Sequence, residues 1–138
     1  MAARDVFHQA VKQALIIDGW TITDDPLVVQ FGGVDLYIDL GAEKLIAAEK
    51  AGHTIAVEVK SFLGASVVSE FHSALGQFLN YRFALKQKEP SRVLFLAVPL
   101  DIYQTFFTLA FTRGVVEQYD VKLVIYHPER QEVFQWIT

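Results

Sequence analysis

Length and composition limit what this chain can be before any motif is considered. Its 138 residues suit a single domain over 1–138, and 52% hydrophobic with 20% charged residues allow a sizeable core. No apolar run reaches the ~18–20 residues of a membrane span, and the N-terminal stretch lacks a signal-peptide pattern, so we expect a cytoplasmic protein without membrane association. The net charge of −4 argues against a protein that coats nucleic acid, and the absence of cysteine excludes disulfides and thiolate metal sites.

The first third of the chain predicts a helix followed by extended segments. Residues 2–17 form the helix, and the Asp18-Gly19 pair ends it. Its predicted apolar stripe has a spacing of three or four: Val6, Ala10, Ala14 and Ile17, joined by Phe7 and Leu15. "WTITDDPLVVQF" predicts extended chain interrupted by Pro26, and "VDLYIDL", after a Gly-Gly turn, fits either a short strand or a helical turn.

The middle of the chain predicts a β-hairpin and then a long helix. "KLIAAEK" (44–50) and "TIAVEVKSF" (54–62) are interpreted as paired strands joined by a turn at "AGH" (51–53). The helix runs over residues 66–88, with Ser66 as its N-cap and Pro90 just beyond its end.

The remaining third predicts two crossover units and a final strand. "RVLFLAVP" has the uninterrupted apolar character of a strand buried on both faces. Residues 101–119 predict a helix that is capped by Asp101, broken near Gly114 and rich in core aromatic residues. "VKLVIYHP" and "EVFQWI" predict two more strands, so we expect an α/β fold with a mixed central sheet flanked by helices.

Two charged residues interrupt the otherwise apolar strand "IAVEVKSF". Alternation along a strand places Glu58 and Lys60 on one face, opposite Ile55, Val57 and Val59. A surface salt bridge, which contributes only ~0–1 kcal/mol, is one explanation. The other starts from the carboxylates that precede the strand: Asp35, Asp39, Glu43 and Glu49.

A second carboxylate beside Glu58 would create a doubly negative pocket. Hard divalent cations such as Mg²⁺ prefer oxygen ligands of that kind. Lys60 would then orient a water molecule or stabilise the charge that develops during phosphodiester cleavage.

This pattern resembles a known nuclease superfamily. An acid followed by E-x-K on the returning strand of a hairpin is similar to PD-(D/E)XK nucleases, whose restriction-endonuclease-like core has the order α-β-β-β-α-β. More specifically, "IDLGAEKLIAAEK", "IAVEVKSFLG" and "ALGQFLNYR", with "ARDVFHQAVKQAL" and "GWTITDDPL" before them, resemble the XisH family of fdxN-element excision controlling factor proteins over almost the whole chain. E-x-K alone occurs by chance in many proteins; the combined pattern is far more specific.

The resemblance implies roles for particular residues. Glu58 and Lys60 stand at the E-x-K positions, and Asp39, 19 residues before Glu58, best matches the preceding acid. Ile38 stands where the superfamily commonly has proline, and Glu43, 15 residues before Glu58, remains the alternative acid.

The same resemblance implies roles for four further residues. The carbonyl of Val59 would join Asp39 and Glu58 as a ligand of Mg²⁺ or Mn²⁺. Gln77 and Tyr81 match the Q-x-x-x-Y pattern of some superfamily nucleases and share a helix face, so either they brace the site or they meet solvent. Asp5 on the first helix is a possible extra acid, although a solvated helix face explains it and His8 equally well.

Two functions follow from the resemblance. The first is a metal-dependent endonuclease that cleaves DNA phosphodiesters and so controls excision of a DNA element during programmed genome rearrangement. The second is a non-catalytic regulatory module of the same fold that acts through a protein partner of the XisI type. The high apolar fraction of so short a chain also predicts a homodimer or a larger assembly.

Overall fold

The computed structural model describes residues 3–44 and 52–138, which build a mixed sheet between helices. Within these residues, six strands form the central sheet in the order β1-β4-β5-β6-β7-β8, and β2 and β3 form a separate two-stranded sheet. The strands are β1 Thr21–Asp24, β2 Leu27–Phe31, β3 Val34–Ile38, β4 Leu40–Lys44, β5 His53–Val59, β6 Val93–Pro99, β7 Leu123–His127 and β8 Glu132–Ile137. The helical segments are α1 Ala3–Ile17, α2 Val67–Lys88, α3 Leu100–Ile102, the π-helix η1 Tyr103–Phe107 and α4 Ala110–Gln118.

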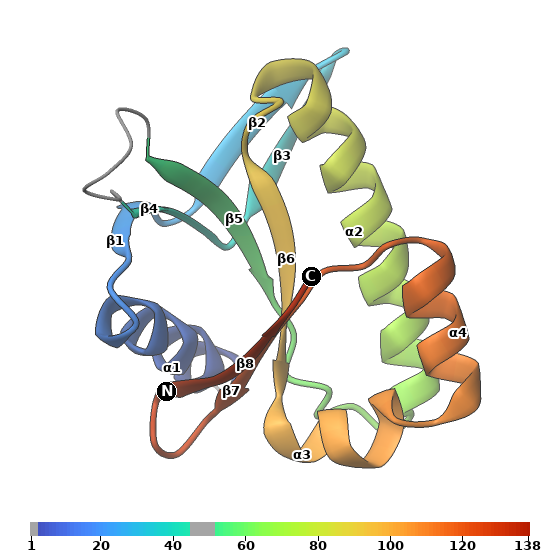
Figure 1. Cartoon of the computed structure of the whole chain (residues 1–138). Coiled ribbons are helices and arrows are strands. Elements are labelled where there is room, and N and C mark those ends of the chain that lie inside the picture. Colours follow the sequence, from blue (N-terminus) through green and yellow to red (C-terminus); the bar gives the residue numbers. More distant parts are fainter. Residues whose placement is uncertain (1–2, 45–51) are drawn as a thin grey trace.

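Helices cover both faces of the central sheet. Strand β6 pairs in parallel with β5 and β7, while the pairs nearer the edges are antiparallel. Figure 1 shows α1 on one side of the sheet and α2 with α4 on the other. The α/β class and the mixed sheet flanked by helices are therefore confirmed, whereas the restriction-endonuclease-like topology stays a prediction.

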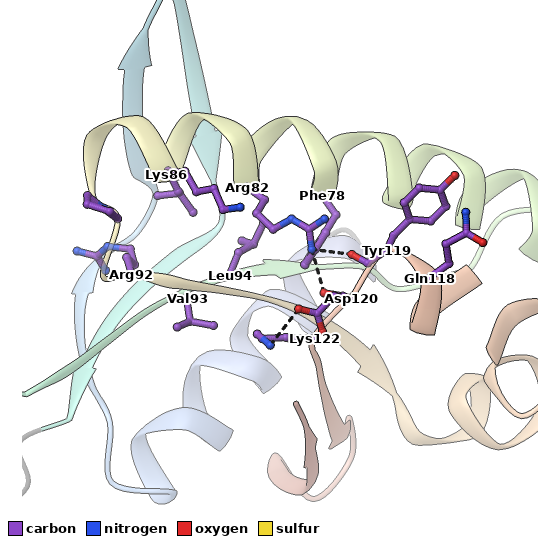
Figure 2. A pocket seen from close by; sticks show the side chains of 12 residues that line it. Phe78, Arg82, Lys86, Arg92, Val93, Leu94, Gln118, Tyr119, Asp120 and Lys122 are labelled. Carbon is purple, nitrogen blue, oxygen red and sulfur yellow. Dashed lines mark hydrogen bonds and ion pairs between the residues drawn. The ribbon is translucent and has the colours of Figure 1, made fainter. Parts of the chain in front are cut away.

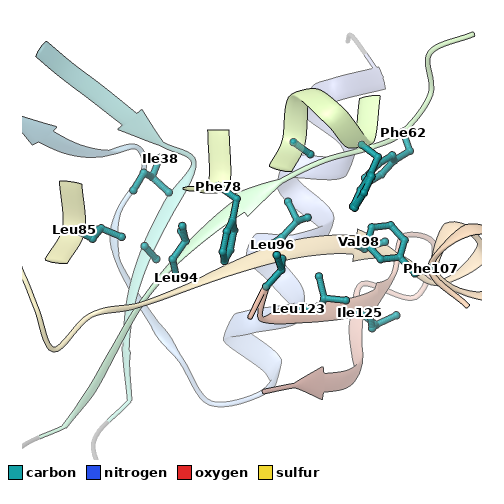
Figure 3. Close-up of a cluster of buried hydrophobic side chains, with 14 of the residues drawn as sticks. Ile38, Phe62, Phe78, Leu85, Leu94, Leu96, Val98, Phe107, Leu123 and Ile125 are labelled. Carbon is teal, nitrogen blue, oxygen red and sulfur yellow. The ribbon is translucent and has the colours of Figure 1, made fainter. Parts of the chain in front are cut away.

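The sheet separates two hydrophobic clusters, because successive side chains of a strand point to opposite faces. Two successive residues of β5 show this directly: Ala56 lies in the cluster under α2, and Val57 lies in the cluster under α1. Figure 3 shows the larger cluster, in which Phe78 and Leu85 of α2 lie over Leu94 and Leu96 of β6. Strand β6 is buried from Leu94 to Pro99, as its uninterrupted apolar sequence predicts.

Helix α1 ends as predicted, but its buried stripe is rotated. Gly19 adopts a φ of +99°, and the N–H groups of Gly19 and Trp20 donate to the carbonyls of Ile16 and Leu15. This is the Schellman arrangement, which favours glycine because a Cβ is strained at that φ. The buried residues are Ala10, Val11, Ala14 and Leu15, whereas the predicted stripe members Val6 and Ile17 are exposed.

Helix α2 matches its prediction closely. The Ser66 hydroxyl accepts a hydrogen bond from the Ser69 N–H at 3.2 Å, so Ser66 is the N-cap. The helix ends at Lys88, two residues before Pro90. Its buried residues are Phe71, Ala74, Phe78, Ala84 and Leu85.

The predicted helix over 101–119 is wrong as one continuous element. The chain forms α3, then η1, and breaks at Thr108 and Leu109 before α4 begins. Asp101 lies inside the first turn and does not cap it, and Gly114 lies within α4. The discontinuity has a packing reason: it turns Phe106 and Phe107 together into the core, where both contact Phe71 edge-on.

The hairpin around β5 uses a different partner from the predicted one. Strand β5 pairs with β4, with Leu40 opposite Val57 and Lys44 opposite His53. His53 therefore lies in a strand and not in the predicted turn. Most of the predicted strand 44–50 lies outside the described residues.

The ambiguous segment after Phe31 is a strand. Strands β2 and β3 pair antiparallel around Gly32 and Gly33, whose φ values of +60° and +90° suit a tight two-residue hairpin turn. In the described part of the chain, no helix has the length and apolar character needed to cross a membrane.

Candidate active site

Asp39 is the single residue between β3 of the two-stranded sheet and β4 of the central sheet. The preceding residue, Ile38, ends β3, and the following residue, Leu40, begins β4. Both neighbours are fully buried, and they lie in different hydrophobic clusters: Ile38 under α2 and Leu40 under α1. These two anchors hold the bend in place and leave the Asp39 carboxylate free to face the end of β5.

Reciprocal hydrogen bonds fasten Asp39 to β5. The Asp39 N–H donates to Glu58 Oε1 at 3.2 Å, and the Val59 N–H donates to Asp39 Oδ2 at 2.8 Å. Lys60 Nζ lies 3.6 Å from Glu58 Oε2, which confirms that Glu58 and Lys60 share a face. Three ionisable groups, from the β3–β4 bend and the end of β5, therefore lie together.

Glu58 is the most unusual member of this group. It is only 5% exposed, so the interpretation as a surface salt bridge is wrong. Burial raises the pKa of Glu58 from 4.5 to about 8, and the neighbouring Asp39 carboxylate adds to the rise. Lys60 and the Asp39 N–H act in the opposite direction but do not cancel it. At neutral pH the pair therefore retains a proton that a bound cation would displace.

A cavity of about 320 Å³ opens beside these residues. Asp39, Val59 and Lys60 line it on the strand side. Gln77 of α2 also lines it, and its buried Oε1 has no hydrogen-bond partner in the described structure. Tyr81 is not among the lining residues and packs partly buried against the core under α2.

Sequence reasoning missed three residues of the cavity wall: Phe7, Ser61 and Glu70. Glu70, in the first turn of α2, accepts a hydrogen bond from the Gly64 N–H at 3.0 Å and lines the cavity with Ser61. Its only sequence signal is its position one turn into the helix that follows the E-x-K strand.

The first helix contributes His8 to the same cavity. His8 Nε2 lies 2.7 Å from Asp25 Oδ1, and Lys12 Nζ lies 2.9 Å from Asp25 Oδ2. Partial burial would raise the pKa of Asp25, but the hydrogen bonds from Lys12 and His8 outweigh it and lower the pKa. The Asp5 side chain lies outside the described part of the structure, so its predicted role stays a prediction.

The alternative acid, Glu43, lies elsewhere. It pairs with Thr54, four residues before Glu58 on β5. At ~3.3 Å per residue this separates Glu43 from the Glu58 position by ~13 Å along the strand. The fold therefore brings Asp39, not Glu43, to Glu58.

The oxygen atoms of the site suit a hard divalent cation. Mg²⁺ commonly takes one or two carboxylates and keeps several water molecules, so the predicted donors Asp39, Glu58 and the Val59 carbonyl would be enough protein ligands for it. Two adjacent carboxylates, one of which holds a proton at neutral pH, also favour a cation electrostatically. Among the described residues, no group of three or more His, Asp or Glu side chains is placed to hold a metal ion.

Comparison with known proteins identifies the family. The model of the XisH protein family matches residues 1–134. A crystal structure of an XisH family protein from Nostoc punctiforme PCC 73102 is 52% identical, covers 97% of this chain and 100% of its own, and superposes with a TM-score of 0.89. A crystal structure of a fdxN element excision controlling factor protein from Anabaena variabilis is 54% identical, covers 98% and 100%, and also has a TM-score of 0.89. None of the curated proteins compared matches the chain. This chain belongs to the XisH family.

Proposed function

We propose that this protein acts in the excision of a DNA element by hydrolysing DNA phosphodiesters with a divalent metal ion. The observation that carries the proposal is the convergence of Asp39, Glu58 and Lys60 beside a cavity. The name of the Anabaena variabilis relative, a fdxN element excision controlling factor, supports the cellular role. A restriction-endonuclease-like origin of the fold is part of the proposal, supported by the acid–E-x-K arrangement on neighbouring strands of a mixed sheet.

Each residue of the site has a distinct role in this mechanism. Asp39, Glu58 and the Val59 carbonyl would hold Mg²⁺ or Mn²⁺, which polarises the phosphate and lowers the pKa of bound water. Lys60, whose Nζ lies 3.6 Å from Glu58 Oε2, would orient the attacking water and stabilise the charge that develops on the phosphate. The Gln77 Oε1, which has no partner among the described residues, would accept a hydrogen bond from a water molecule.

DNA cleavage tests the proposal directly. Linear, branched and single-stranded DNA are incubated with the protein and Mg²⁺ or Mn²⁺, and the Lys60→Met variant is compared with Lys88→Met. Lys88 lies on the last turn of α2, outside the cavity, so Lys88→Met removes the same charge elsewhere. We expect the wild type and Lys88→Met to cleave and Lys60→Met to lose ~10²-fold or more in rate. Cleavage by Lys60→Met at the wild-type rate would refute the role of Lys60.

A second candidate function is a regulatory module that acts through an XisI-like protein partner. The β2–β3 hairpin favours it, since apolar side chains there remain exposed on the hairpin and on the adjoining surface of α2: Val28, Phe31, Val34, Tyr37 and Phe83. Exposed apolar surface of this kind often marks a protein interface. Light scattering of the protein alone, and then with an XisI-like protein, separates a homodimer from a heteromeric complex. Tyr37→Lys, on the outer face of the hairpin, should weaken whichever assembly uses this surface.

A further inference from the structure

A second cavity, of about 450 Å³, is lined by residues of α2 other than those that line the carboxylate cavity. Its walls are the C-terminal half of α2 and the segment that links α4 to β7, with the start of β6 between them (Figure 2). Its volume falls within the range of ~300–1,000 Å³ that is typical of small-molecule sites. It is also the place where basic side chains gather, since four of the chain's 12 lysines and arginines line it: Arg82, Lys86, Arg92 and Lys122.

Three of these four cations remain available to a ligand. Arg92 is largely committed to the fold, because it donates to the Ile55 carbonyl at 2.8 Å and to Glu89 Oε1 at 3.0 and 3.2 Å. Arg82, Lys86 and Lys122 face a single lining carboxylate, Asp120. The cavity is therefore locally positive in a protein whose net charge is −4.

Hydrogen bonds hold one of these three basic side chains in place and leave the other two less constrained. Arg82 Nη1 donates to the carbonyls of Tyr119 and Asp120 at 2.7 and 2.9 Å, which fixes the guanidinium between the two walls, as Figure 2 shows. Its Nε and Nη2 have no acceptor among the described residues and remain available to an anion. Lys86 has no ion-pair or hydrogen-bond partner in the described structure, and Lys122 Nζ lies 3.5 Å from Asp120 Oδ2.

Apolar surface lies next to these basic side chains in the cavity. Val93 and Tyr119 line the cavity and are about two-fifths exposed. Behind them, Phe78 and Leu94 close the floor, and the Arg82 guanidinium lies 5.3 Å from the Phe78 ring centroid. A bare inorganic anion would use only the cations, whereas a ligand with a flat ring and a phosphate would use both surfaces.

We propose that this cavity binds a nucleotide through its phosphate, either as a free nucleoside phosphate or as the 5′-phosphorylated end of a nucleic-acid strand. Arg82, Lys86 and Lys122 hold the phosphate, and the base lies against Tyr119 and Val93. Val93 is in register with Ile55, four residues before Val59, so the cavity lies ~13 Å along the strands from the end of β5. A mononucleotide bound here leaves the carboxylate cavity free.

Calorimetry and ³¹P NMR with defined probes test this site. The probes are inorganic phosphate, adenosine, adenosine 5′-monophosphate and an oligothymidylate with or without a 5′-phosphate. Lys86→Gln/Lys122→Gln is compared with Lys88→Gln/Arg130→Gln, which removes the same two charges from exposed positions outside the cavity. Circular dichroism verifies that both double variants are folded.

The expected result is saturable binding of adenosine 5′-monophosphate that is tighter than that of phosphate or adenosine. The cavity variant should weaken this binding about tenfold or more, and the control variant should not. Tighter binding of the 5′-phosphorylated oligonucleotide than of the monophosphate supports the strand end as ligand, and the reverse order supports a free nucleotide. Absence of saturable binding by every probe, equal weakening by both double variants, or phosphate binding as tight as that of the monophosphate would overturn the proposal.

Discussion

Replacing Glu58 by glutamine is expected to make stability less dependent on pH. Glutamine has nearly the shape of a protonated glutamic acid, and its oxygen can still accept from the Asp39 N–H, which donates to Glu58 Oε1 at 3.2 Å. The pKa of Glu58 is about 8 in the folded protein and 4.5 as an ordinary glutamate, so between these values the folded state binds more protons than the unfolded state. Stability linked to Glu58 is therefore fully present below pH 4.5 and is lost as pH rises through about 8.

The size of this effect follows from the same two values. At ~1.4 kcal/mol for each pH unit, the interval from 4.5 to about 8 corresponds to on the order of 5 kcal/mol of unfolding free energy. We expect the wild type and Glu58→Gln to be similarly stable at pH 4.5, and Glu58→Gln to become the more stable protein by several kcal/mol at pH 9. The groups that face Glu58 are Asp39, which adds to the effect, and Lys60, which reduces it.

Urea denaturation across pH 4.5–9, with EDTA present, measures these free energies. EDTA is required because a cation bound to the carboxylates would stabilise the native wild type. Glu129→Gln, at an exposed position in the turn between β7 and β8, removes the same formal charge away from the site. If the stability of Glu58→Gln falls with pH in parallel with the wild type, burial of Glu58 beside Asp39 does not control its ionisation and the reasoning is refuted.

Three further changes test the site and its support. Gln77→Leu removes a buried oxygen that has no partner in the described structure, so we expect unfolding free energy to be unchanged or higher while DNA cleavage falls; loss of stability would show that the oxygen has a structural partner. Phe71→Ala, at the centre of three aromatic contacts and a helix–sheet core, should cost ~3–5 kcal/mol in urea unfolding, and a loss below ~1 kcal/mol would contradict the packing described. Ser66→Ala should cost ~1 kcal/mol because it removes the cap of α2, whereas Ser69→Ala keeps the donating N–H and serves as the control; equal losses would argue against the cap.

Local sequence patterns were sufficient to predict that Glu58 and Lys60 share one face of their strand. Strand alternation alone places them on one face, and the 3.6 Å ion-pair distance agrees. Alternation did not reveal that Glu58 is buried, because the burial depends on α2 and on the β3–β4 bend, which are remote in the sequence. The same limit applies to Glu70, which reaches the cavity only through the path of the loop that precedes α2.

The strand that pairs with β5 could not be predicted from the local sequence pattern, because two neighbouring segments have similar strand character. Leu40 ends a segment, "VDLYIDL", that fits either a short strand or a helical turn, and "KLIAAEK" follows it within a few residues. What decides the pairing is tertiary: β3 ends at Ile38 in one cluster and Leu40 enters the other, which requires β4 to begin there.

The helical region after Pro99 was mispredicted for a related reason. Its apolar residues satisfy a helical period over 101–119, and no proline interrupts them. The π-helical turn at 103–107 and the break at Leu109 are imposed by packing of Phe106 and Phe107 around Phe71, a contact between distant parts of the chain.

Anomalous diffraction from crystals grown with millimolar Mn²⁺ tests most directly whether Asp39 and Glu58 form a metal site. We expect one anomalous peak within coordination distance of both carboxylates and of the Val59 carbonyl, with Lys60 Nζ turned from Glu58 toward the cavity. No peak at this position, with Lys60 still paired to Glu58, would contradict the account.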